Sequence, residues 1–129
     1  EGQLYPGHRW HFAMSRIAMA AKAAGLRAID APYGNFKDAE GLAKSASMAC
    51  ALGFDGKWAI HPDQLGTINQ IFSPGPADVQ RAQRVLKAHD AARQAGHGAA
   101  AFEGRMIDQA TVRLARQTVE MAHHLGMLE

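Results

Sequence analysis

Three residues of this sequence stand where an α/β protein places its chemistry. Asp30 ends the short apolar run LRAID, His61 follows the run FDGKWAI, and Asp108 lies in FEGRMIDQA at the start of a helical pattern. In parallel α/β folds, ligands bind at the carboxyl ends of strands and in the loops that follow them. These three positions are therefore the candidates for catalysis or binding.

Each of the three side chains has a functional and a structural interpretation. The Asp30 carboxylate can bind a hard cation, accept a proton or hydrogen-bond the backbone of its own loop. The His61 imidazole can be a ligand, a base or a pocket wall, or it can be a structural histidine. Asp108 has the position of a helix N-cap, which is the default explanation for an aspartate there. The pattern alone leaves these alternatives open.

Short strands that alternate with helices predict an α/β fold with a parallel sheet. Strands are expected at residues 26–30 and 54–60, and a short extended piece, as a hairpin around Glu103 and Gly104, is expected at residues 97–108. Helices are expected at residues 9–25, 38–53, 61–72, 73–96 and 108–126. Sheets usually contain about 4–6 strands, so two strands indicate a partner-dependent piece or part of a larger domain. The first residue is Glu1 instead of methionine, which favours the second explanation.

The sequence also predicts how the helices begin, end and pack. Asp38 is expected to cap the second helix, and Gly25 and Gly53 are expected to follow helix ends. Pro62 is expected in the first turn of a helix, where its missing N–H costs nothing. The expected apolar face of the first helix consists of Phe12, Ile17, Ala20, Ala21 and Ala24.

Composition narrows the class of protein. The 129 residues are 47% hydrophobic and 20% charged, which is ordinary for a globular protein. The formal net charge is +2 and the basic residues are scattered, so no nucleic-acid partner is expected. Cys50 is the single cysteine, which rules out an internal disulfide and a zinc cluster built on cysteines. No signal peptide and no apolar stretch of about 18 residues is visible, so we expect a cytoplasmic location without membrane contact.

Two long segments, taken in order, resemble one family. The segment AIDAPYGNFKDAEGLAKSASMACALGFDGKWAIHPDQLGTINQIFSP is followed about thirty residues later by FEGRMIDQATVRLA. Together they are similar to the C-terminal half of malyl-CoA lyase and the citrate lyase β-subunit-like proteins of the HpcH/HpaI aldolase superfamily. The resemblance implies a TIM-type (β/α)8 barrel, whose last βα units would be residues 1–96. Residues 97–129 would be a C-terminal hairpin and helix that reach a neighbouring subunit of a trimer or hexamer.

The resemblance also implies a reaction, the reversible Claisen cleavage of a 3-hydroxyacyl-CoA such as malyl-CoA to acetyl-CoA and glyoxylate. A magnesium ion would hold the 2-oxo acid and polarise its carbonyl. Asp108 matches the family's catalytic aspartate, which comes from across a subunit interface and acts as acid or base. Ile60 and His61 match the pair that lines the acyl-CoA site. Asp30 would lie at the mouth of the pocket, among the substrate-binding residues.

One departure limits what the resemblance implies for this chain. The family's magnesium ligands are a glutamate and an aspartate on earlier strands, and its substrate-binding arginine also lies upstream, so no metal ligand is assigned here. Residues 1–129 alone are therefore expected to be inactive. Close alternatives are a citramalyl-CoA or citryl-CoA lyase and a relative that hydrolyses the thioester as malate synthase does. An alternative from another class is a non-catalytic α/β fragment that acts as an interaction module.

Overall fold

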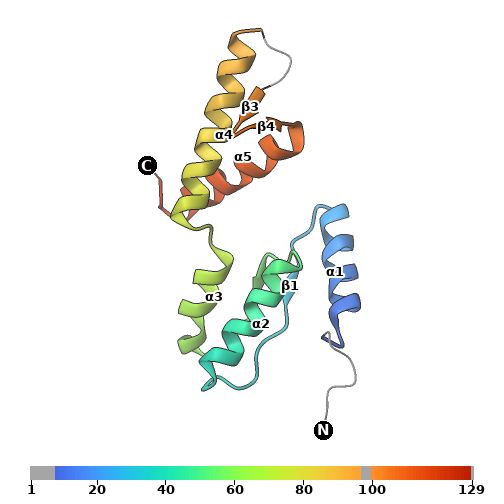
Figure 1. Cartoon of the computed structure of the whole chain (residues 1–129). Helices are drawn as coiled ribbons and strands as arrows, with labels where there is room; N and C mark the ends of the chain where they lie inside the picture. The colour runs from blue at the N-terminus through green and yellow to red at the C-terminus, as the bar shows by residue number, and fades with distance from the viewer. Residues whose placement is uncertain (1–7, 97–99, 129) are drawn as a thin grey trace. The chain divides into compact units, whose positions relative to one another are not determined.

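The computed structural model shown in Figure 1 describes residues 8–96 and 100–128. Contacts within the chain divide it into two compact units, residues 1–72 and residues 73–129. The first unit contains α1 (His11–Ala23), β1 (Ile29–Asp30), α2 (Ala39–Ala51), β2 (Gly56–Lys57), the 3-10 helix η1 (Pro62–Gln64) and α3 (Leu65–Phe72). The second unit contains α4 (Pro76–Gln94), β3 (Ala100–Phe102), β4 (Arg105–Ile107) and α5 (Gln109–His124).

The first unit is built on a parallel βαβ arrangement, as the alternation of elements predicts. β1 pairs with β2 in parallel, with Ile29 opposite Gly56 and Asp30 opposite Lys57. The regular ladder is shorter than the predicted strands, because an apolar run marks extended backbone whereas a ladder forms only where two strands overlap in register. Backbone bonds at both ends extend the pairing slightly: the Trp58 N–H donates to the Asp30 carbonyl at 3.0 Å. The carboxyl ends of β1 and β2 therefore lie side by side.

The packing face of α1 differs from the predicted one. Phe12 and Ile17 are 72% and 57% exposed, although the apolar spacing placed both on the buried face. The helix packs instead through Ala18, with Met14 and Ala21 beside it, in a cluster completed by residues of the β1–α2–β2 segment. These three positions are spaced by four and three residues, which places them on one face of a helix. The prediction was right for Ala21 and wrong for Phe12 and Ile17, because alanine occurs on several faces of α1 and does not define one stripe.

The helix ends confirm the local predictions. Asp38 caps α2 by accepting a hydrogen bond from the Gly41 N–H at 2.9 Å. Gly25 and Gly53 follow the ends of α1 and α2 with φ of 69° and 94°, a left-handed conformation that costs glycine little. Pro62 opens η1, which leads directly into α3.

In residues 73–96 and 100–128, the second unit contains the helices α4 and α5 and the hairpin of β3 and β4 (Figure 1). α4 and α5 share a core formed by Ala82, Val85, Ile107, Val112 and Ala115. The hairpin pairs β3 and β4 antiparallel and turns at Glu103 and Gly104, which confirms its predicted place. Both turn residues have positive φ, and Glu103 carries a side chain there at φ 51°. The predicted domain boundary after residue 96 concerns the complete protein and stays a prediction; here α4 belongs to the same compact unit as the hairpin.

Across residues 8–96 and 100–128, no helix is long and apolar enough to cross a membrane.

Candidate functional site

Asp30 lies at the carboxyl end of β1 and forms a buried ion pair. The Lys57 Nζ is 2.6 Å from the Asp30 Oδ2, and the two side chains are only 3% and 12% exposed. Buried charges are stable in a protein interior only when they are paired and hydrogen-bonded. The partner of Asp30 is therefore a cation of the neighbouring strand. Lys57 is not among the residues predicted from the sequence, although a lysine inside the apolar run FDGKWAI is itself a signal.

The loop that follows β1 is organised by Asp38. The Tyr33 hydroxyl donates to the Asp38 Oδ2 at 2.7 Å, and the Gly41 N–H donates to the other carboxylate oxygen. The Gly41 N–H, followed by the Tyr33 hydroxyl, holds the pKa of Asp38 below its ordinary value. The hydrogen bond from the Tyr33 hydroxyl to Asp38 raises the pKa of Tyr33, because loss of the hydroxyl proton would put a second negative charge beside the Asp38 carboxylate.

The loop that follows β2 carries His61 as the cap of η1. The His61 Nδ1 accepts a hydrogen bond from the Asp63 N–H at 3.3 Å. The imidazole stacks on the Phe36 ring with centroids 4.5 Å apart and planes at 18°. Phe36 belongs to the loop after β1, so this stack joins the two loops. His61 thus contacts Asp63 and Phe36, and it remains partly exposed.

Gln64 makes a second connection between the two loops. Its side chain is buried, and the residue is 1% exposed. The Oε1 accepts a hydrogen bond from the Ile60 N–H at 2.8 Å, and the Nε2 donates to the Tyr33 carbonyl at 2.8 Å. Gln64 could not be predicted from the sequence, because a glutamine in a first helical turn gives no local sign that its partners are distant.

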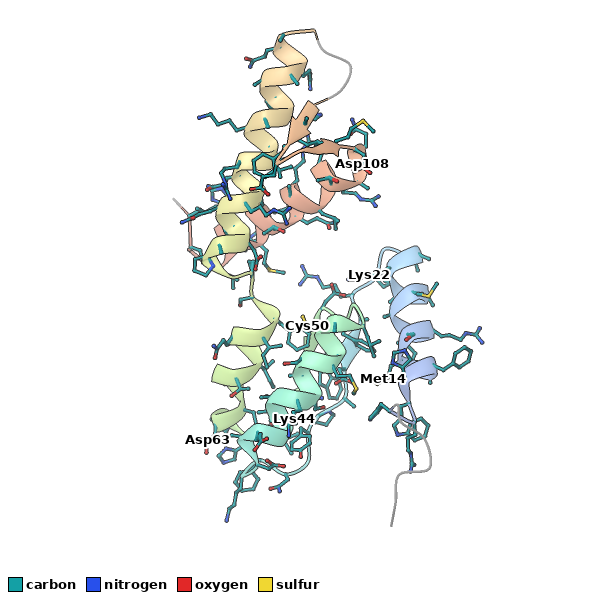
Figure 2. All side chains as sticks on the ribbon, in the orientation of Figure 1. Met14, Lys22, Lys44, Cys50, Asp63 and Asp108 are labelled. Atoms are coloured by element: carbon teal, nitrogen blue, oxygen red, sulfur yellow. The ribbon has the colours of Figure 1, made fainter. Side chains whose placement is uncertain are left out.

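The structure therefore brings three of the four predicted site residues together. Asp30, Ile60 and His61 lie at the carboxyl ends of β1 and β2, and the loops that carry them are tied to each other through Gln64 and Phe36. Figure 2 labels Asp63, which belongs to η1, the short helix that His61 caps. The Ile60 side chain is 55% exposed, so it is available for contact with another molecule.

Asp108 lies in the second unit as the N-cap of α5 (Figure 2). Its Oδ1 accepts a hydrogen bond from the Thr111 N–H at 2.7 Å. Hydrogen bonds from the Thr111 backbone and then the Thr111 hydroxyl lower the pKa of Asp108, so the carboxylate is ionised at neutral pH. The capping interpretation is confirmed. The carboxylate is also exposed, which leaves its role in catalysis as a prediction.

Comparison with known proteins identifies the family. Residues 2–62 match the family described as HpcH/HpaI aldolase/citrate lyase. The L-malyl-CoA/beta-methylmalyl-CoA lyase of Cereibacter sphaeroides is 38% identical over 126 residues, which make up 98% of this chain and 40% of that protein. The chain belongs to the HpcH/HpaI aldolase/citrate lyase family.

Other similar proteins agree with this family and its fold. The human mitochondrial citramalyl-CoA lyase is 39% identical over 111 residues, covering 86% of this chain and 33% of that protein. The crystal structure of CitE from Mycobacterium tuberculosis in complex with magnesium, acetoacetate and coenzyme A has a TM-score of 0.72 at 33% identity, covering 95% of this chain and 45% of that one. A citrate lyase structure from Burkholderia xenovorans LB400 has a TM-score of 0.73 at 24% identity, over 89% of this chain and 35% of that one, and supports the fold. The chain spans about 40% of the length of the malyl-CoA lyases it matches.

The described part of this HpcH/HpaI family chain does not fit a magnesium site. Within residues 8–96 and 100–128, no three histidine, cysteine, aspartate or glutamate side chains are grouped so that they could hold a metal ion. The Asp30 carboxylate is bound to Lys57, and both oxygens of Asp38 already accept hydrogen bonds. No residue of this chain is therefore assigned to the magnesium that the family resemblance implies.

The second unit has one shallow cavity that contains none of the predicted site residues. Its volume is about 390 Å³ and its wall is mostly apolar. The lining residues are Leu86, Arg116, Val119, Glu120, His123 and His124.

Proposed function

We propose that this chain is part of a carbon–carbon lyase that cleaves a 3-hydroxyacyl-CoA of the malyl-CoA type to acetyl-CoA and glyoxylate, and catalyses the reverse condensation. The observation that carries the proposal is the 38% identity to a malyl-CoA lyase over 98% of the chain. The complete protein would be a TIM-type barrel, with residues 1–96 as its last βα units and residues 97–129 as an extension. The parallel β1–α2–β2 arrangement supports this fold.

The proposal gives the residues of this chain two kinds of role. Ile60 and His61 would form a wall of the acyl-CoA site, because they lie at the carboxyl end of β2 where ligands bind in parallel α/β folds. Asp30 would shape the mouth of the same pocket through its bond to Lys57. The half-exposed Ile60 side chain and the partly exposed His61 ring support contact with a ligand.

Asp108 would act on the acetyl group from a neighbouring subunit. An ionised carboxylate can accept a proton from the methyl carbon of acetyl-CoA in the condensation direction. In the cleavage direction, the protonated group returns this proton to the enolate carbon. The lowered pKa of Asp108 keeps the carboxylate ionised, as the condensation direction requires, but it also makes the carboxylate a weaker base. Magnesium dependence belongs to the proposal for the complete protein, with ligands outside this chain.

The proposed assembly is a homo-oligomer, a trimer or hexamer, whose small-molecule partners are an acyl-CoA and glyoxylate. The proposed location is cytoplasmic, and the single cysteine, Cys50, is consistent with a reducing compartment because it allows no internal disulfide.

A second candidate substrate is citramalyl-CoA. The human citramalyl-CoA lyase is 39% identical over 86% of this chain, and the malyl-CoA lyase of Cereibacter sphaeroides is 38% identical over 98% of it. Cleavage of citramalyl-CoA gives acetyl-CoA and pyruvate, because the substrate carries a methyl group where malyl-CoA has hydrogen. The two reactions are therefore separated by the oxo acid that is released.

Product analysis of the complete protein tests these assignments. We expect magnesium-dependent release of glyoxylate from malyl-CoA together with acetyl-CoA. Pyruvate from citramalyl-CoA at a higher kcat/KM would support the second substrate, and free CoA thiol would indicate thioester hydrolysis. Absence of all three products would favour an interaction module. Residues 1–129 alone are expected to release nothing, and activity of this piece would contradict the placement of the metal ligands outside it.

A further inference from the structure

Gln64 uses both ends of its side-chain amide to join the two loops that carry the predicted substrate wall. Its Oε1 accepts from the Ile60 N–H and its Nε2 donates to the Tyr33 carbonyl, a residue 31 positions away in the sequence. Both donor–acceptor distances are 2.8 Å and the residue is 1% exposed. A buried amide that satisfies two backbone groups of different loops fixes their separation, because losing it would leave both groups unpaired.

The position of this contact relates it to the site. Ile60 is bound through its backbone N–H, while its side chain stays 55% exposed. His61, the next residue, is held by stacking of its ring on Phe36. The two wall residues are thus fixed at the backbone or the ring face and keep surface for a ligand. This combination is expected of a preorganised binding wall.

We propose that Gln64 is a positioning residue for the acyl-CoA site, which holds Ile60 and His61 at a fixed distance from the loop of Tyr33. This inference rests on the proposed function, since it assumes that these residues contact the acyl-CoA. Gln64 touches neither substrate nor reacting atoms in this account. Its removal should therefore weaken substrate binding while the chemical step proceeds at nearly the same rate.

The first test compares Gln64→Met with Gln70→Met in the complete protein. Methionine has a similar size but cannot form either hydrogen bond, and Gln70 is an exposed residue of α3 that serves as a matched control. We expect Gln64→Met to raise KM for the acyl-CoA about tenfold and to change kcat less than about twofold. We expect no change for Gln70→Met. A KM for Gln64→Met equal to that of the control would overturn the proposal.

The second test uses Gln64→Glu and remains decisive if the methionine variant does not fold. A protonated carboxyl group can make both hydrogen bonds, because its O–H donates to the Tyr33 carbonyl and its C=O accepts from Ile60. An ionised carboxylate cannot donate, and burial raises the pKa at which it forms. The ratio of variant to wild-type KM should be close to one at about pH 5.5 and about tenfold at about pH 8. A ratio that does not change with pH would contradict a positioning role.

Dividing by the wild-type KM at each pH removes the titration of other groups. The loops around Gln64 also carry Asp38, His61 and Asp63, and the Asp30–Lys57 pair lies at their base. These groups are present in both proteins.

Amide hydrogen exchange at Ile60 separates failure of this inference from failure of the proposed function. The Ile60 N–H should exchange at least about tenfold faster in Gln64→Met than in wild type or Gln70→Met, whatever reaction the protein catalyses. If wild type cleaves no acyl-CoA but this exchange difference is found, the proposed function fails and the connection between the loops stands. If exchange is equal in all three proteins, the positioning role fails even in an active lyase.

Discussion

Lys57 lies directly opposite Asp30 in the parallel pair of β1 and β2, with 2.6 Å between its ammonium nitrogen and the carboxylate. Both side chains are nearly buried, so each charge is stable in the protein interior only while the other is present. The pair lies at the base of the loops that carry Ile60 and His61. Its integrity should therefore matter both for stability and for the shape of the proposed site.

Removal of one partner should be strongly destabilising. We expect Asp30→Asn to lower the free energy of unfolding by about 3–5 kcal/mol, because it leaves the Lys57 ammonium buried and unpaired. Adding Lys57→Met to this variant should recover part of the loss. Urea denaturation of the three proteins measures these changes in the free energy of unfolding, provided that its dependence on urea concentration, the m-value, is the same in all of them.

The exposed pair of Glu40 and Lys44 on α2 serves as a control for the buried one. These side chains are 80% and 75% exposed, so Glu40→Gln should cost less than about 1 kcal/mol. Equal losses for Asp30→Asn and Glu40→Gln would show that the pair between β1 and β2 is not buried in the complete protein.

Gly41 should not tolerate a side chain. A Cβ at this position would collide with the Tyr33 hydroxyl and the Asp38 carboxylate. We expect Gly41→Ala to destabilise the protein by about 1–3 kcal/mol, because the capping hydrogen bonds must separate to make room. Gly66→Ala in α3 is the matched control, since nothing lies within 4 Å of its Cβ, and it should be stabilising by about 0.5–1 kcal/mol. The same sign for both substitutions would contradict the packing around Tyr33.

Asp55 should make the first unit sensitive to acid. Burial by itself would raise its pKa, but hydrogen bonds from Lys22, labelled in Figure 2, and from the Ala28 N–H outweigh this and hold the pKa below the ordinary 3.8. Because the folded-state pKa is depressed, its stabilising contribution is present above the unfolded value and is lost as pH falls through the folded value.

The comparison of wild type with Asp55→Asn measures this contribution. We expect wild type to be the more stable protein at pH 7, and the difference between their urea midpoints to shrink once the pH falls below 3.8. A difference that stays constant down to about pH 2 would show that the Asp55 carboxylate does not carry the effect.

Local chemistry explains what could be predicted from the sequence. The caps at Asp38 and Asp108 follow from residue types within three positions of their partners. The ends at Gly25 and Gly53 follow from the conformational freedom of glycine. The family resemblance, carried by the segments around Asp30, His61 and Asp108, is confirmed by the comparisons.

Long-range partners explain what could not be predicted. Lys57 and Gln64 bind groups 27 and 31 positions away, and no local pattern names such a partner. The packing face of α1 was predicted wrongly at Phe12 and Ile17, because packing against the rest of the unit selected the small residue Ala18 instead.

The central claim is that Asp108 supplies the catalytic carboxylate of a lyase. The complete protein with Asp108→Asn tests it most directly, because asparagine still caps a helix well but cannot accept the proton. Asp78→Asn is the control, since Asp78 also accepts a backbone hydrogen bond at a helix start, from the Gly75 N–H. We predict a fall in kcat of about 10²–10⁴-fold for Asp108→Asn, with magnesium binding, CoA binding and melting temperature unchanged. Turnover equal to that of wild type and Asp78→Asn would remove Asp108 from the mechanism and leave it as a helix cap.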